Sequence, residues 1–208
     1  MDPFANVPAS AGPTNAFPGI REGQYTLSNA QVPCERISAI APALPAEAGH
    51  LAGAALTPPR YPFVVDAVQY SLEEAPDIPT CNSTFAHRVE LTVLNQGALP
   101  ARPSTDGVSA QVIMVPDSPG LSGRRVIRQI LETPITLEEG QRLLISVSLE
   151  AQGSEHLCIA VCEDQNAVNG GNFWSNAAGE PYQWSDLTSF GIFAPLVIEA
   201  TGDIVPSE

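Results

Sequence analysis

The sequence contains no lysine. All nine of its basic residues are arginines, against 23 aspartates and glutamates, which gives a net charge of −14. Proteins bind nucleic acid by placing cations against phosphates, and basic segments bring proteins to anionic membranes. We therefore predict that this acidic chain binds neither nucleic acid nor an anionic membrane surface. The same charge predicts a soluble protein whose copies repel one another at long range.

Long apolar runs are also missing. None approaches the roughly 20 residues that a membrane-spanning helix needs, so we predict no membrane span. The first twenty residues, MDPFANVPASAGPTNAFPGI, have neither the basic nor the apolar region of a signal peptide. We interpret the chain as a mature form whose export signal has been removed.

The compact motifs of common enzymes are absent as well. The chain has no G-x-G-x-x-G, P-loop, G-x-S-x-G or H-E-x-x-H sequence. Its histidines, His50, His87 and His156, are scattered, and we expect His87 to make hydrogen bonds at the surface. Neighbouring acids such as Glu163 and Asp164 would suit a glycoside hydrolase, but chance alone places acids together in so acidic a chain. We predict no catalytic residues, and a hydrolase remains the less favoured alternative.

The four cysteines, Cys34, Cys81, Cys158 and Cys162, form no C-x-x-C pair of the kind common in zinc sites. If Cys158 and Cys162 share one extended strand, their Cα atoms lie about 13 Å apart. A disulfide requires at most about 6.8 Å. We therefore expect these two to pair with Cys34 and Cys81, in either combination, with free buried cysteines as the alternative. Disulfides would indicate an extracellular or cell-surface location.

Twenty prolines and sixteen glycines favour a turn-rich β protein. Alternating apolar residues predict strands, which we place at residues 61–72, 85–94, 108–115, 143–149, 156–163 and 190–200, with a weaker one between Tyr25 and Pro33. Residues 126–131 are predicted to form a short strand or a helical turn, and residues 133–140 a strand that ends in a tight turn at Glu139 and Gly140. Residues 41–60 are predicted to form a loop, because prolines and glycines interrupt them. Residues 149–156 are predicted to form a hairpin loop with Gly153 at a positive φ.

This pattern predicts an all-β fold: a single antiparallel β-sandwich, jelly-roll-like, over residues 25–208. Residues 1–24, rich in proline and glycine, are predicted to form an N-terminal arm or tail. We find no internal repeat and no second domain.

Three blocks of sequence together resemble a known kind of module. They are YPFVVDAVQY at 61–70, PITLEEGQRLLISVSL at 134–149, and the FWSN, YQWSDL and GIFAPLVIEA segments within 173–200. Their order resembles the jelly-roll-type β-sandwich accessory modules of bacterial secreted and cell-surface proteins, over about residues 61–200. The resemblance implies an extracellular location and an accessory or binding role, and it carries no catalytic residue.

Both tryptophans and Tyr182 fall near the C-terminus. We predict that residues 173–186 form a loop that displays aromatic rings, with Phe173, Trp174, Asn176 and Tyr182 as ligand-binding residues. Exposed aromatic rings stack on sugar faces and anchor protein partners. The alternative is that these rings fill the core, a role that we assign to Trp184 and Leu187.

Asp164, Asn166 and Asn169 are the candidate metal ligands, because calcium favours clustered oxygen atoms. The segment does not fit an EF-hand, so we predict no resident cofactor except for calcium at a looser site. The alternative is a polar turn in which Asn169 and Gly170 provide hairpin geometry.

These observations predict a non-enzymatic extracellular β-sandwich that binds carbohydrate or another surface macromolecule. The alternative is a structural subunit of an extracellular assembly or appendage, in which residues 1–24 contact a neighbour. The predicted partners are carbohydrate or protein at the cell surface, including other copies of the chain.

Overall fold

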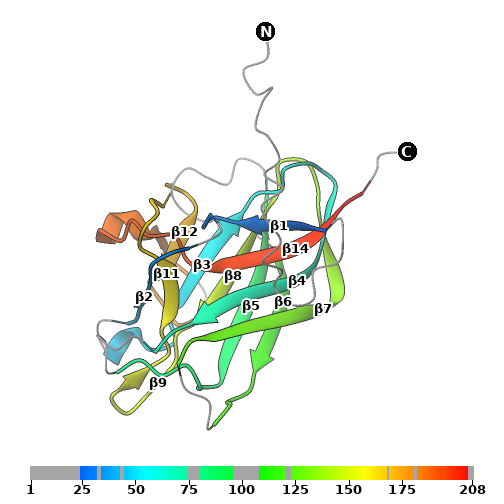
Figure 1. Cartoon of the computed structure of the whole chain (residues 1–208). Helices are drawn as coiled ribbons and strands as arrows, with labels where there is room; N and C mark the ends of the chain where they lie inside the picture. Colours follow the sequence, from blue (N-terminus) through cyan, green and yellow to red (C-terminus); the bar gives the residue numbers. More distant parts are fainter. Residues whose placement is uncertain are drawn as a thin grey trace.

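The computed structural model describes residues 24–31, 34–42, 45–74, 80–95, 108–119, 123–167, 169–179 and 182–205. These residues form two antiparallel sheets that pack face to face (Figure 1). Helical structure among them is confined to two short 3-10 turns, η1 (Pro45–Glu47) and η2 (Leu187–Phe190), and none of it is long and apolar enough to cross a membrane. The predicted all-β sandwich is confirmed. Except for Gln24, the predicted arm lies outside the described residues.

The first sheet has the order β1-β14-β4-β11-β2, and β7 pairs with β4. Its strands are β1 (Tyr25–Ser28), β2 (Ile37–Ile40), β4 (Phe63–Leu72), β7 (Arg125–Leu137), β11 (Ile159–Cys162) and β14 (Ile198–Ile204). A separate hairpin joins β9 (Ala151–Gln152) to β10 (Glu155–His156). Gly153 lies in this hairpin with φ of 63°, as predicted.

The second sheet has the order β13-β12-β3-β8-β5-β6. Its strands are β3 (Leu51–Leu56), β5 (His87–Leu94), β6 (Val108–Val115), β8 (Arg142–Ser148), β12 (Asn172–Ser175) and β13 (Trp184–Asp186). The loop predicted at 41–60 is wrong where β3 lies. This strand pairs with β12 on one side and β8 on the other, and all six of its residues are buried. Small residues suit this position, because a Cβ atom on Gly53 would lie 3.0 Å from Leu144 Cδ1.

Two further strand predictions need correction. The short strand or helical turn expected at 126–131 and the separate strand expected after it are one strand, β7, which contains Pro134. Pro134 lies between Ile130 and Ile135, where the register with β4 shifts and residues 131–134 have no partner in β4, so the missing N–H costs no ladder hydrogen bond. The last strand does not begin near Phe190, because η2 and a turn intervene and β14 starts at Ile198.

The sandwich has two apolar clusters. The main core lies between the sheets and includes Phe63, Tyr70, Leu91, Ile145 and Ile198, among others. A smaller cluster lies on the opposite, outer face of the second sheet, and consists of Leu51, Ala55, Leu94, Leu144, Phe173 and Trp184. The second sheet is therefore partly covered on both faces.

Two disulfides join the N-terminal half of the chain to the strand β11 region. Cys34 pairs with Cys162, and Cys81 pairs with Cys158. Cys162 ends β11, and Cys158 directly precedes that strand. The prediction that Cys158 and Cys162 bond to Cys34 and Cys81, and not to each other, is confirmed.

Candidate binding site

The predicted display loop is wrong over its first residues. Phe173 and Trp174 belong to β12, which pairs with β3 on one side and β13 on the other. Trp174 points into the main core, is 8% exposed, and donates its indole N–H to His50 Nδ1 at 3.2 Å. Phe173 points to the outer face and is fully buried in the smaller cluster. Both rings of this predicted pair are therefore core residues.

Tyr182 and Asn176 lie in the connection between β12 and β13. The Tyr182 ring packs on the smaller cluster, 5.5 Å from the Trp184 ring, and its hydroxyl donates to Glu90 Oε1 at 2.8 Å. Arg88 lies beside Glu90, with 2.7 Å between Arg88 Nε and Glu90 Oε1. Asn176 is exposed and donates to Ser185 Oγ. Tyr182 thus holds its connection against β5 while keeping part of its ring at the surface. Trp184 and Leu187 are buried, as predicted.

The rings that the structure does display come later in the chain. Phe190 is 52% exposed and Phe193 is 59% exposed. They lie on the segment from Leu187 to Phe193, which we call the aromatic loop. The loop follows β13 at an edge of the second sheet. Figure 1 shows this region, in orange, on the opposite side of the molecule from β6 and β7.

Hydrogen bonds and a buried leucine anchor the aromatic loop. Asp186 caps η2 by accepting from the Thr188 N–H at 2.9 Å, and its other carboxylate oxygen accepts from the Gly170 N–H at 2.5 Å. Gly191 ends the turn at φ of 77°, a left-handed conformation that favours glycine. Leu187 is buried in the main core between these two ends. The two phenyl rings are therefore exposed on an ordered support.

Polar side chains surround the aromatic loop. The carbonyl of Phe193 accepts a hydrogen bond from the Ala167 N–H, which places the exposed Asn166 beside that ring's backbone. Asn169, also exposed, accepts from the Thr188 hydroxyl at 3.0 Å. The surface at this edge thus combines two apolar rings with uncharged amides and hydroxyls.

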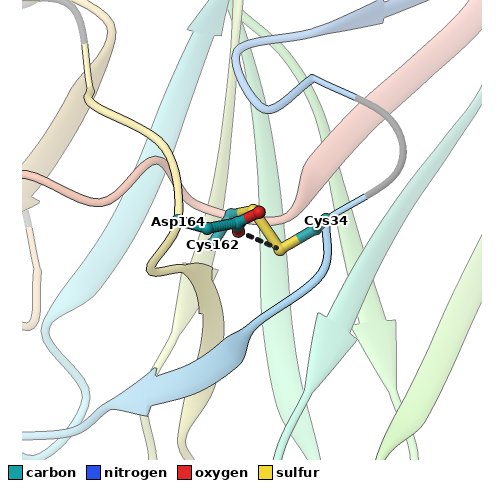
Figure 2. Close-up of side chains that lie close together, drawn as sticks. All are labelled: Cys34, Cys162 and Asp164. Atoms are coloured by element: carbon teal, nitrogen blue, oxygen red, sulfur yellow. Dashed lines mark hydrogen bonds between the residues drawn. A yellow bond between two sulfur atoms is a disulfide. The ribbon is translucent and has the colours of Figure 1, made fainter.

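Asp164, the third predicted calcium ligand, is oriented toward the protein. One of its carboxylate oxygens accepts from the Glu35 N–H and the other from the Arg36 N–H, beside the disulfide of Cys34 and Cys162 (Figure 2). Desolvation opposes ionisation, but these backbone hydrogen bonds and the Arg36 charge outweigh it and lower the pKa of Asp164. The two sulfur atoms are bonded to each other and provide no thiolate ligands. Calcium binding at Asp164, Asn166 and Asn169 stays a prediction.

The surface role expected for His87 is wrong, because the ring is 2% exposed. Its Nδ1 bonds with the Phe85 carbonyl at 2.8 Å, so Nδ1 carries the proton and Nε2 accepts from the Tyr70 hydroxyl at 2.5 Å. Burial lowers the pKa of His87 and raises the pKa of Tyr70. This neutral pair is a hydrogen-bonded part of the core.

Sequence reasoning missed Phe190 and Phe193 because it extended the last strand over them. One local signal does mark the turn, since Gly191 lies between the two rings and Asp186 precedes a run that starts with Leu187 and Thr188. An acidic cap followed by glycine is typical of a short helical turn. The signal does not say which rings face solvent.

Comparisons with known proteins identify the fold and no family. No family model matches the chain, and no curated protein matches it. Two solved structures are similar to it: a clostridial cysteine protease, Cwp84, after propeptide cleavage (TM-score 0.54), and the cysteine protease and lectin-like domains of Cwp84, a surface layer associated protein of Clostridium difficile (TM-score 0.52). Each match has 10% identity and covers 89% of this chain, which spans only 41% and 37% of those chains. At this identity the likeness shows the fold alone.

Proposed function

We propose that this protein is a non-enzymatic extracellular module that binds carbohydrate through the aromatic loop. The observation that carries the proposal is the exposure of Phe190 and Phe193 on an ordered loop. Exposed apolar surface that gathers in one place on a soluble protein often marks a binding site, and these two rings are close together in the sequence. A preorganised loop also binds at a lower entropic cost than a mobile one.

The chemistry around the rings favours a sugar over other ligands. Phenyl rings stack on the C–H faces of pyranoses, while amides and hydroxyls exchange hydrogen bonds with sugar hydroxyls. Thr188 on the aromatic loop, Asn169 bonded to it, and Asn166 beside the Phe193 backbone provide such groups. The net charge of −14 repels anionic polysaccharides, so we expect neutral glycans to bind better than sulfated or uronic ones.

Two further observations support an extracellular location. The chain has two disulfides, and disulfides form and persist in oxidising compartments such as the cell exterior. The solved structures with a similar fold belong to a surface layer associated protein, one part of which is called lectin-like. We propose the same kind of location and binding role for this chain.

The test is calorimetric titration of the protein with a panel of soluble neutral and anionic polysaccharides. Calorimetry suits this protein because both tryptophans are buried, so their fluorescence is a poor reporter of stacking at the loop. Each exposed ring at a binding hot spot contributes about 1–2 kcal/mol, so the loss of both rings in F190A/F193A should weaken binding roughly 30- to 1,000-fold. Ile130→Ala, which removes a 78% exposed side chain from β7, is the matched control and should bind normally.

The remaining predicted ligand residues provide separate arms of the same experiment. Tyr182→Ala tests the surface of the β12–β13 connection, which also holds Asn176. Repeating the titration with calcium and then with EDTA tests the predicted role of Asp164, Asn166 and Asn169. Loss of binding in Tyr182→Ala with F190A/F193A unaffected would move the site away from the aromatic loop. No binding across the whole panel would refute the proposal.

A further inference from the structure

The second sheet ends in a strand with an open edge. Among the described strands β6 pairs only with β5, so the backbone groups along its other side have no partner strand. β6 spans Val108–Val115, VSAQVIMV, with no charged residue and no proline. Such an edge is a ready template for pairing with another strand. The aromatic loop lies beside β13 at the other edge of this sheet.

The other outer strands carry features that discourage pairing. β7 contains Pro134 together with Arg125, Arg128 and Glu132. β1 and β2 have four residues each, and β13 has three. Charges, prolines and short length are the usual devices that keep edges from associating. In a chain with a net charge of −14, an uncharged edge of eight residues is a distinct exception.

Two apolar side chains of β6, Val112 and Met114, are exposed on the outer face. Val112 is 53% exposed and Met114 is 69% exposed. Val112 lies opposite Glu90 of β5, and Met114 lies opposite Arg88. Ile113 points the other way and packs against the main core, so the backbone of this edge is firmly supported.

We propose that β6 is a homodimer interface, in which the β6 strands of two copies pair antiparallel across a two-fold axis at Ile113. The partner is a second copy because antiparallel pairing of one strand with its own symmetry mate is self-complementary. With Ile113 on the axis, Val112 of each copy lies opposite Met114 of the other, and both exposed apolar residues become covered.

The neighbouring charges favour this register. Each row of side chains across the joined sheet then contains Arg88 and Met114 of one copy, followed by Val112 and Glu90 of the other. The two ends of the row therefore carry opposite charges. An axis at Val112 would instead place the two Glu90 residues in one row, three strand spacings apart, where their repulsion is weak and is felt mainly at low ionic strength. The absence of charge on β6 itself lets two acidic copies approach at this edge.

The dimer would have a functional consequence that is separate from the carbohydrate proposal. The order β13-β12-β3-β8-β5-β6 places the aromatic loop about 24 Å from the β6 edge, at roughly 4.8 Å per strand. Pairing at β6 would leave both aromatic loops free at the far ends of a continuous sheet. Such a module would be bivalent for a repeating surface polymer.

The test is the mass of the whole chain in solution, by analytical ultracentrifugation over a range of concentrations. We expect a dimer. V112E/M114E places glutamates opposite each other twice across the axis, and should weaken dimerisation at least 100-fold. Because both positions are exposed, the fold should be retained, as circular dichroism will check. Ile130→Glu adds a charge at an exposed position of β7 and should leave the dimer intact.

A charge exchange makes the test specific to this edge. V112K/M114K should also be monomeric alone, and an equal mixture with V112E/M114E should restore a dimer that contains one chain of each kind. A monomeric wild-type chain would overturn the inference, and so would a dimer that persists in V112E/M114E. The monomeric variant carries one aromatic loop per particle. Its affinity for a glycan therefore tests the carbohydrate proposal independently of the dimer.

Discussion

Replacing Trp174 with alanine tests whether its ring is displayed or buried. The ring is 8% exposed, lies in the main core, and donates its N–H to His50. Removing a buried tryptophan costs about 3–5 kcal/mol through lost burial and the cavity that remains. A domain of this size has about 5–15 kcal/mol of stability in total, so Trp174→Ala should lose a large part of it.

Urea unfolding measures this loss, followed by circular dichroism and by the fluorescence of the remaining Trp184. With an m value of about 2 kcal/mol/M, the midpoint should fall by roughly 2 M without a change in m. Phe190→Ala is the control, because removal of an exposed ring should change the unfolding free energy by less than about 0.5 kcal/mol. A loss below about 1 kcal/mol in Trp174→Ala would refute the placement of this ring in the core.

Two further predictions concern the first sheet. Glu199 is buried beside Gln69, and desolvation, opposed by the Arg128 charge, raises its pKa from 4.5 to about 7. The folded state therefore holds a proton that the unfolded state releases, so the unfolding free energy should fall as pH rises from about 4.5 to 7, by up to about 3 kcal/mol. Glu199→Gln should flatten this slope in urea titrations at several pH values, and an unchanged slope would contradict the assignment. Gly202 follows a β-bulge, where a Cβ atom would collide with the Val64 carbonyl. Gly202→Ala should lower the unfolding free energy by about 2–3 kcal/mol, whereas Gly179→Ala, which has open space around it, should be neutral by the same assay.

The predictions that held were those that depend on the chain's local geometry. Alternating apolar residues indicated most strands, because neighbouring side chains of a strand always point to opposite faces. The rise of an extended strand kept Cys158 and Cys162 from pairing, and both bond to partners far along the chain. Gly153 adopts the positive φ that its hairpin requires. The sequence alone therefore determined an all-β sandwich. It also determined that Cys158 and Cys162 bond to Cys34 and Cys81 and not to each other.

Only the tertiary structure decided which rings face solvent. Phe173 and Trp174 are adjacent, so a strand with one wet face would expose one of them, but β12 is covered on both faces and buries both. Phe190 and Phe193 resemble core residues in sequence, yet Asp186 and Gly191 turn the chain and leave them outside. The small residues of β3 have no strand preference of their own and so predict a loop, but pairing with β12 and β8 on its two sides makes the segment a strand. Burial depends on what covers a surface, and segments far apart in the sequence provide that cover.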